Sequence, residues 1–162
     1  MMPVGKILRA ARFAMLLAVP LAMAGCAQKN ADQTGMAGAA SPGSQQEFVV
    51  NVGDRVFFTT DSTTLTPQSI ATLDKQAQWL QQYGQYTFTL EGHADERGTR
   101  EYNIALGARR AQTVREYLAS RGISPQRMRT ISYGKERPVA VCNDISCWSQ
   151  NRRVVTVLNA SS

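Results

Sequence analysis

The stretch from Gly92 to Leu118 carries the side chains best suited to binding a small charged ligand. Asp95 lies in a short charged loop, and Asn103 and Arg110 lie seven positions apart in the helical pattern that follows. Seven positions are close to two helical turns, so the amide and the guanidinium share one flank of the helix. The spacing therefore predicts one cleft with an acid at one end, a base two turns up the helix and an amide between them.

Opposed charges in a fixed cleft are suited to a zwitterion. Asp95 would accept an ammonium group, and Arg110 would bind a carboxylate through its bidentate fork. The alternative is that Asp95 caps the loop while Arg110 is a solvated surface charge, because exposed ion pairs are common and weak. Spacing by itself does not decide between the two interpretations.

A long amphipathic helix is expected to hold these groups. Thr99 fits the N-cap position, which places the Glu101 carboxylate at the positive end of the helix dipole. Gly122, followed by Pro125, predicts the end of the helix. The residues expected to face the core recur at helical spacing and are Ile104, Ala108, Ala111, Val114 and Leu118.

The remaining pattern predicts an α+β fold. Residues 48–58 favour a strand or a strand pair broken near Gly53, and a helix should start at Pro67 behind a Thr66 cap and end by Gly84. Alternating residues 86–90 predict the strand that delivers Asp95, and further strands are expected at 129–133 and 154–158, with a loop at 137–150 between them. The order β-α-β-α-β-β gives a two-layer sandwich, a mixed sheet with both long helices on one face.

One run of residues closely resembles a known family. Gly92-His93-Ala94-Asp95-Glu96-Arg97-Gly98, followed by Glu101-Tyr102-Asn103-Ile104-Ala105-Leu106-Gly107 and Arg109-Arg110-Ala111, is similar to the OmpA-like peptidoglycan-binding domain. The similarity covers roughly Phe48 to Leu158. In that family the loop Asp and the helix Arg bind the diaminopimelate of the peptidoglycan stem peptide, which implies these roles for Asp95 and Arg110. Ala94 replaces the usual Thr, so one secondary hydrogen bond is not expected here.

The resemblance implies further site residues. The family's Phe-x-x-Asp-x-x-x-Leu pattern matches Phe58, Asp61 and Leu65, which makes Asp61 a ligand contact; the alternative is an ordinary turn-forming Asp. His93 is the only histidine, so we expect it to line the cleft or to form a hydrogen bond rather than to act in catalysis. The Asn-Arg-Arg run at 151–153 also occurs in the family, and one of its arginines is expected to brace the cleft or the acids of the loop.

Residues Met1 to Gly25 have the pattern of a secretory signal peptide. Lys6, Arg9 and Arg12 form a basic start, and an apolar run from Phe13 to Met23 follows. The run is shorter than the ~20 residues that span a bilayer. These three basic residues supply half of the net charge of +6, so the rest of the chain is too mildly basic to suggest a nucleic-acid partner.

The end of this segment predicts a lipid anchor. Ala24-Gly25-Cys26 resembles a bacterial lipobox, in which Cys26 becomes the lipidated first residue, although Met23 stands where Leu, Val or Ile is usual. The alternative is ordinary cleavage after Ala24, which would release a soluble periplasmic protein. Because Ala27 rather than Asp follows Cys26, the outer membrane is the expected location. Residues 26–47 are expected to form the lipidated end and a flexible linker, with the domain at 48–159.

Cysteine counting supports the lipobox. Cys142 and Cys147 can form a disulfide in an oxidising compartment, which leaves Cys26 as the odd cysteine. The alternative is two free thiols. A cysteine pair without other cysteines or clustered histidines is a poor zinc site, so neither a metal nor a cofactor is expected.

The expected function is non-covalent binding of peptidoglycan by an outer-membrane lipoprotein, without enzymatic activity. The lipid-anchored members of the family also bind the periplasmic propeller protein TolB, so TolB and possibly other Tol proteins are implied as partners by resemblance. A peptidoglycan hydrolase is the alternative from another class. It would need a metal cluster, a nucleophile paired with a base, or two opposed catalytic carboxylates, and the sequence offers none of these as a motif.

Overall fold

A computed structural model of the chain describes residues 40–159. The predicted signal peptide, Cys26 and most of the predicted linker lie outside the described residues. The elements in chain order are α1 (Gln45–Glu47), η1 (Phe48–Gly53), β1 (Arg55–Phe57), α2 (Pro67–Gln82), β2 (Phe88–His93), α3 (Arg100–Ser120), η2 (Pro125–Arg127), β3 (Met128–Gly134), α4 (Ile145–Asn151) and β4 (Arg153–Leu158).

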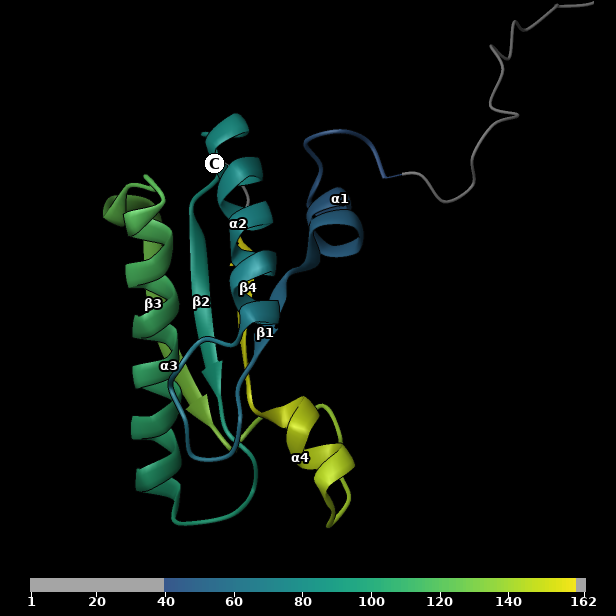
Figure 1. Cartoon of the computed structure of the whole chain (residues 1–162), viewed down its shortest axis with the longest axis vertical. Helices are drawn as coiled ribbons and strands as arrows, with labels where there is room; N and C mark the ends of the chain where they lie inside the picture. The colour runs from purple at the N-terminus through teal and green to yellow at the C-terminus, as the bar shows by residue number, and fades with distance from the viewer. Residues whose placement is uncertain (1–39, 160–162) are drawn as a thin grey trace, which may run out of the picture. The chain divides into compact units, whose positions relative to one another are not determined.

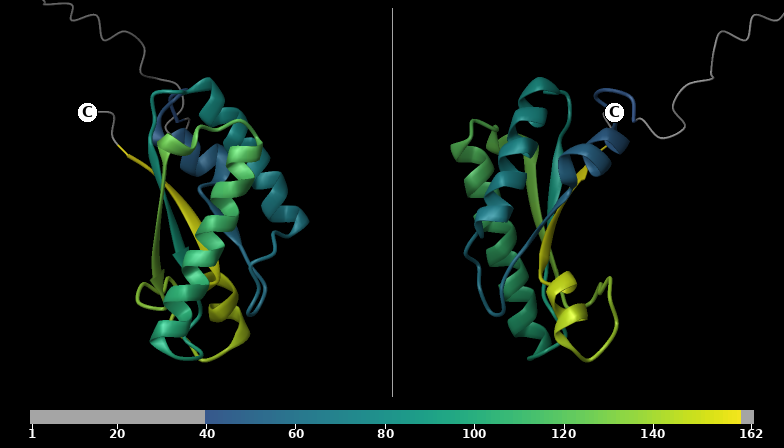
Figure 2. Two further views of the ribbon diagram at one scale, coloured as in Figure 1. Left: turned by 90° about the vertical axis from the view of Figure 1, so that its left-hand side faces the viewer. Right: turned by 45° about the vertical axis from the view of Figure 1, so that its right-hand side comes forward.

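The four strands form one mixed sheet in the order β1-β4-β2-β3. β2 is parallel to β3 and antiparallel to β4, and β4 is antiparallel to β1. The two long helices α2 and α3 cover the same face of this sheet (Figure 1, Figure 2). The predicted α+β sandwich is therefore confirmed. No helix within residues 40–159 combines the length and the apolar character that crossing a membrane requires.

Both long helices begin at the predicted caps. The Thr66 hydroxyl accepts a hydrogen bond from the Ser69 N–H, with Pro67 in the first helical position. The Thr99 hydroxyl accepts one from the Tyr102 N–H, with Glu101 in the first turn. These side chains pair backbone donors that have no partner inside the helix.

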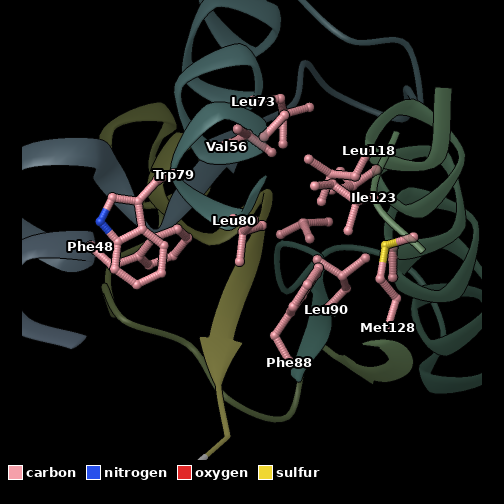
Figure 3. Close-up of a cluster of buried hydrophobic side chains, with 14 of the residues drawn as sticks. Phe48, Val56, Leu73, Trp79, Leu80, Phe88, Leu90, Leu118, Ile123 and Met128 are labelled. Atoms are coloured by element: carbon pink, nitrogen blue, oxygen red, sulfur yellow. The ribbon is translucent and has the colours of Figure 1, made fainter. Parts of the chain in front are cut away.

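The core lies between the helices and the sheet, as Figure 3 shows. Leu73 and Leu80 of α2, Phe88 and Leu90 of β2, and Leu118 of α3 are each fully buried. Alternate residues of β2 point into this core, which is the period of 2 that the sequence shows there.

The buried side of α3 differs from the predicted stripe. Ala111, Val114 and Leu118 are buried as predicted, but Ile104 is only half-buried and Ala108 is exposed. The other residues of α3 that are buried are Leu106, Gly107 and the polar residues Asn103 and Arg110. The apolar pattern did not reveal this, because two polar side chains are buried through their hydrogen bonds rather than through their hydrophobicity.

The segment before β1 is the main correction to the predicted elements. A strand or strand pair was expected over 48–58, but only Arg55–Phe57 is a strand, and η1 is a short π-helical stretch. Phe48 is fully buried and packs on Trp79, with 4.9 Å between the ring centroids. Residues 45–47, placed in the predicted linker, are helical because the Ser44 hydroxyl caps them. The Tyr86 hydroxyl donates to the Gly43 carbonyl at 2.8 Å, which holds this segment beside the start of β2.

The predicted loop at 137–150 is a second correction. It contains α4, whose N-cap is Asp144, a carboxylate that accepts from the Ser146 N–H at 2.8 Å. Seven residues are too few for a periodic signal, so this helix could be found only through its cap. The predicted disulfide between Cys142 and Cys147 is present.

Two glycines set how closely α3 approaches β2. A Cβ added at Gly92 would overlap the carbonyl oxygen of Gly107, and one added at Gly107 would overlap the Ser132 hydroxyl. The Gly92 backbone cannot yield easily, because β2 is an inner strand that is paired with β4 on one side and β3 on the other. This contact fixes the first half of α3, the part that carries Asn103 and Arg110.

We therefore expect Gly92→Ala to lower the free energy of unfolding by about 3 kcal/mol or more, the upper range for an overpacked site. Urea unfolding followed by circular dichroism measures it. Gly84→Ala is the matched control, because a Cβ at Gly84 meets nothing within 4 Å. An equal change in both variants would contradict the close approach of α3 and β2.

Candidate functional site

Four of the five predicted ligand-binding residues lie together. Asp61, Asp95, Asn103 and Arg110 line one cleft of about 280 Å³. Its lining residues come mainly from the loop after β2 and the first half of α3, and α4 lies at the same end of the sheet (Figure 1). The other lining residues of the cleft are Thr60, Arg97, Gly98, Tyr102 and Leu106.

Arg110 forms the buried base of the cleft and is 0% exposed. Its guanidinium donates to three backbone carbonyls, those of Ser62 at 2.9 Å, His93 at 2.9 Å and Thr59 at 3.1 Å. Burial lowers the pKa of Arg110 to about 10, helped by the charge of Arg152 and opposed by Asp95 and Asp61. No carboxylate within residues 40–159 forms a salt bridge with it. The predicted solvated surface charge is therefore excluded, but three of its five N–H groups are already engaged.

Asp95 is paired with two arginines. Its carboxylate accepts from Arg97 Nη2 at 2.7 Å and Nε at 3.1 Å, and from Arg152 Nη1 at 3.2 Å. Burial alone would raise the pKa of this carboxyl, but the hydrogen bonds from Arg97 and Arg152 outweigh burial and lower it. Asp95 is thus a charged group held in one orientation at the edge of the cleft.

Asp61 is the more accessible of the two acids. Its side chain is exposed and accepts a hydrogen bond from the Tyr102 hydroxyl, a contact that raises the pKa of Tyr102. Its backbone has φ of +52°, in the left-handed region that Asp tolerates better than most residues. The turn expected at Asp61 and the proximity to the cleft are therefore both present.

Asn103 joins the helix to the preceding loop. It is 2% exposed, and its amide donates to the Arg97 carbonyl at 2.8 Å. The amide predicted to lie between acid and base is thus engaged in holding the loop.

The structure does not bring His93 to the cleft. Only its carbonyl faces Arg110, while its ring is 2% exposed and lies 5.6 Å from the ring of Tyr133, measured between centroids. Neither ring nitrogen has a hydrogen-bond partner among the described residues. Burial lowers the pKa of His93 to about 4, and the charges of Arg153 and Arg137 lower it further in the same direction. A role in lining the cleft, expected from the sequence, does not fit this position.

The two arginines of the Asn-Arg-Arg run have different positions. Arg152 bonds to Asp95 and donates from Nε to the Phe58 carbonyl at 3.1 Å. Arg153 donates to the carbonyls of Arg137 and Asn151 instead. The arginine that braces the cleft is therefore Arg152.

Sequence reasoning did not assign Arg97 or Tyr102 to the site. Both occur in the motif that carries the family resemblance, but neither has a pattern that distinguishes a cleft residue from a solvated one.

Among residues 40–159, one group of three possible metal ligands lies close together, namely Cys142, Asp144 and Cys147. The disulfide occupies both sulfur atoms, so this group does not provide thiolate ligands.

Comparisons with known proteins place the chain in a family. Residues 57–152 match the OmpA family, and the chain belongs to that family. Within it, the chain resembles proteins named peptidoglycan-associated lipoprotein. The one from Rhizobium meliloti is 66% identical over 151 residues, which cover 90% of this chain and 86% of the relative. The one from Pseudomonas aeruginosa is 41% identical over 161 residues, covering 88% and 95%.

Solved structures agree with this placement. The crystal structure of the peptidoglycan-associated lipoprotein from Burkholderia pseudomallei is 42% identical with a TM-score of 0.64, and the match covers 65% of this chain and 90% of that one. The C-terminal domain of Helicobacter pylori MotB has a TM-score of 0.62 at 21% identity, covering 67% and 86%, which is a likeness of fold alone. The resemblance seen in the sequence is thus confirmed. The relatives are named as lipoproteins and not as enzymes, in agreement with the expected absence of catalysis.

The buried His93 predicts a pH dependence of stability. Its folded pKa of about 4 lies below the ordinary 6.5, so the unfolded chain takes up the proton first as the pH falls. The free energy of unfolding should therefore decrease between pH ~6.5 and ~4, by about 3 kcal/mol at most, and His93→Phe should remove this part of the decrease. Urea unfolding at several pH values measures the difference between the two proteins. Since His93 is the only histidine, NMR of its imidazole provides a direct check, and titration near pH 6.5 in the folded protein would contradict the prediction.

Proposed function

We propose that this protein binds the diaminopimelate-containing stem peptide of peptidoglycan without forming a covalent bond. The observation that carries the proposal is the buried Arg110 guanidinium, which lines the cleft opposite two acids and has no salt-bridge partner within residues 40–159. A buried charge without a partner is costly, and a ligand carboxylate would supply the missing counter-charge. The family resemblance and the names of the relatives support the same ligand.

The arrangement of charges suits the zwitterionic head group of diaminopimelate. A carboxylate would approach the free N–H groups of Arg110, and the ammonium group would lie toward Asp61 and Asp95. Of the two acids, Asp61 is better placed for this contact, because Asp95 already accepts hydrogen bonds from Arg97 and Arg152. Asp95 would add charge at a fixed position rather than act as the sole acceptor.

A modest affinity for one site would be sufficient. Charge-assisted hydrogen bonds contribute about 1.5–3 kcal/mol each, so two anchoring contacts, less the cost of ordering, suggest a Kd no tighter than tens of micromolar. The wall repeats the ligand many times, and membrane-bound copies of the protein would act together.

The amino-terminal sequence suggests where the protein works. Residues 1–25 would be a lipoprotein signal peptide, and lipidated Cys26 would hold the protein in the outer membrane, with residues 26–47 as the connection to a periplasmic domain at 48–159. The described segment at 45–53 would shorten the flexible part of that connection. The protein would then tie the outer membrane to the wall as part of the Tol-Pal system, which serves envelope integrity and cell division. TolB is its expected protein partner by resemblance.

Two changes in the cleft test the binding proposal: Asp61→Asn removes a charge, and Arg110→Lys keeps the charge but removes the bidentate guanidinium fork. We expect Asp61→Asn and Arg110→Lys each to reduce retention on isolated sacculi about 10-fold or more, since one charge-assisted contact is lost in each. Asp61→Asn is the sharper variant, because Asp61 is exposed and its replacement should leave the thermal melt unchanged. Co-sedimentation of the full-length protein with sacculi provides the measurement.

Glu101→Gln is the matched control, because Glu101 is an exposed acid on the same helix that does not line the cleft. Undiminished retention of Asp61→Asn and Arg110→Lys would contradict the proposed site. Release of soluble wall fragments by the unmodified protein would support the hydrolase instead.

Lipidation is tested separately. Cys26→Ala should move the protein from the membrane fraction to the soluble periplasmic fraction, because it removes the acyl attachment point. The double variant Cys142→Ala, Cys147→Ala should remain in the membrane fraction, which controls for loss of cysteine as such. Membrane fractionation of Cys26→Ala would point to an uncleaved signal segment and against the lipoprotein proposal.

A further inference from the structure

The short helix α4 lies beside the cleft without lining it. The disulfide joins Cys142, before the helix, to Cys147 within it, and the Cys147 side chain is largely buried. The amide of Asn151, at the end of α4, binds the same preceding segment: it accepts from the N–H groups of Val139 and Ala140 and donates to the Ala140 carbonyl. A covalent bond at one end and three hydrogen bonds at the other therefore fix α4 to the chain that leads into it.

Trp148 extends from this helix to the loop that carries the cleft acid. Its indole Nε1 donates to the Glu96 carboxylate at 3.1 Å. The guanidinium carbon of Arg97 lies 4.2 Å from the centroid of the Trp148 ring, which is a cation–π contact. Both partners are the residues that follow Asp95 in the chain.

The loop backbone is held by a different residue. The Lys135 ammonium donates to the carbonyls of Glu96 at 3.1 Å and Gly98 at 2.7 Å. Trp148 contacts the side chains of Glu96 and Arg97 instead. Loss of the indole should therefore leave the course of the loop unchanged and release mainly the Arg97 guanidinium.

This guanidinium is the partly exposed member of the pair that holds Asp95. The Arg97 side chain is 42% exposed and the Arg152 side chain only 7%. An exposed arginine has many rotamers, and ordering one of them costs conformational entropy. The Trp148 ring restricts Arg97 to the rotamer that bonds Asp95, while Arg152, directly after α4, bonds Asp95 from the buried side. Both cations on Asp95 thus depend on the position of α4.

We propose that Trp148 is a positioning residue for the ligand cleft, and that the Cys142–Cys147 disulfide keeps it in place. Trp148 acts through Arg97, whose fixed guanidinium orients the Asp95 carboxylate and sets the charge at the cleft edge. The inference rests on the proposed binding of a stem peptide, but its first consequence is visible without any ligand: Arg97 is ordered only when Trp148 is present.

The test is a double-mutant cycle in the full-length protein. Trp148→Leu should weaken retention on sacculi about 3- to 5-fold, the loss that one exposed cation–π contact would give. In an Arg97→Ala background the same change should have no further effect, because the contact through which Trp148 acts is already gone. Ile145→Ala is the matched control, since Ile145 is 61% exposed on the same helix and should leave retention unchanged.

Two further measurements separate positioning from general destabilisation. In NMR spectra without ligand, Trp148→Leu should shift the Arg97 Nε–H signal and speed its exchange with solvent, as expected for a guanidinium that has become mobile, while Ile145→Ala should not. The double variant Cys142→Ser, Cys147→Ser should lose retention to the same extent as Trp148→Leu, and the combination of all three changes should lose no more.

The inference is overturned if Trp148→Leu has the same effect with and without Arg97, or if the Arg97 signal is unchanged. Failure of the unmodified protein to bind sacculi would reject the proposed function instead, and the NMR measurement would still decide whether Trp148 positions Arg97.

Discussion

The arrangement of the cleft depends on the three hydrogen bonds that the Arg110 guanidinium donates to backbone carbonyls. These carbonyls belong to the loop between β1 and α2, at Thr59 and Ser62, and to the end of β2, at His93. A single side chain of α3 therefore ties these two segments to the helix, and the two segments and the helix surround the cleft. The polar bonds satisfy the donors of a buried group but leave its charge uncompensated, which is the condition that favours an anionic ligand.

Burial of this charge requires the surrounding packing to be rigid. The Phe58 ring lies 5.2 Å from the Arg110 guanidinium carbon, and the Phe58 carbonyl accepts from Arg152. The direct contact of Gly92 with Gly107 brings α3 close enough to β2 for Arg110 to reach the His93 carbonyl. The glycine pair sets the distance between α3 and β2, and at that distance Arg110 can donate to the His93 carbonyl.

Much of this arrangement could be predicted from the sequence. The caps at Thr66 and Thr99, the strand before Asp95 and the long motif around Arg110 are local signals, and each was predicted correctly. The disulfide followed from counting cysteines. The sequence did not show that Asn103 and Arg110 face the core, because burial of polar groups depends on hydrogen-bond partners that are distant along the chain. For the same reason it did not reveal the isolation of His93 from the cleft or the role of Arg152.

The segment η1 and the helix α4 mark the limit of such reasoning. Phe48 of η1 is buried against Trp79, more than thirty residues later, whereas residues 48–58 taken by themselves favour a strand or a strand pair. In α4, Ile145 and Cys147 have low helix propensity, so the sequence does not favour a helix there. Tertiary contacts decide that this segment is helical. Short elements are stabilised mainly by what they pack against, which a pattern along the chain does not contain.

The contact between Tyr86 and Gly43 places the entry of the amino-terminal segment at the start of β2, whereas the cleft lies beyond its end. The six residues of β2 separate the two points by about 20 Å along the strand. A pull between a membrane-bound amino terminus and a ligand in the cleft would act parallel to the strands. Because the amino-terminal segment runs on into β1, such a force would first load the short ladder between β1 and β4 in shear, so its hydrogen bonds would share the tension instead of opening one after another. A tether between two surfaces that pulled in this direction would therefore load the sheet along its strands rather than across them.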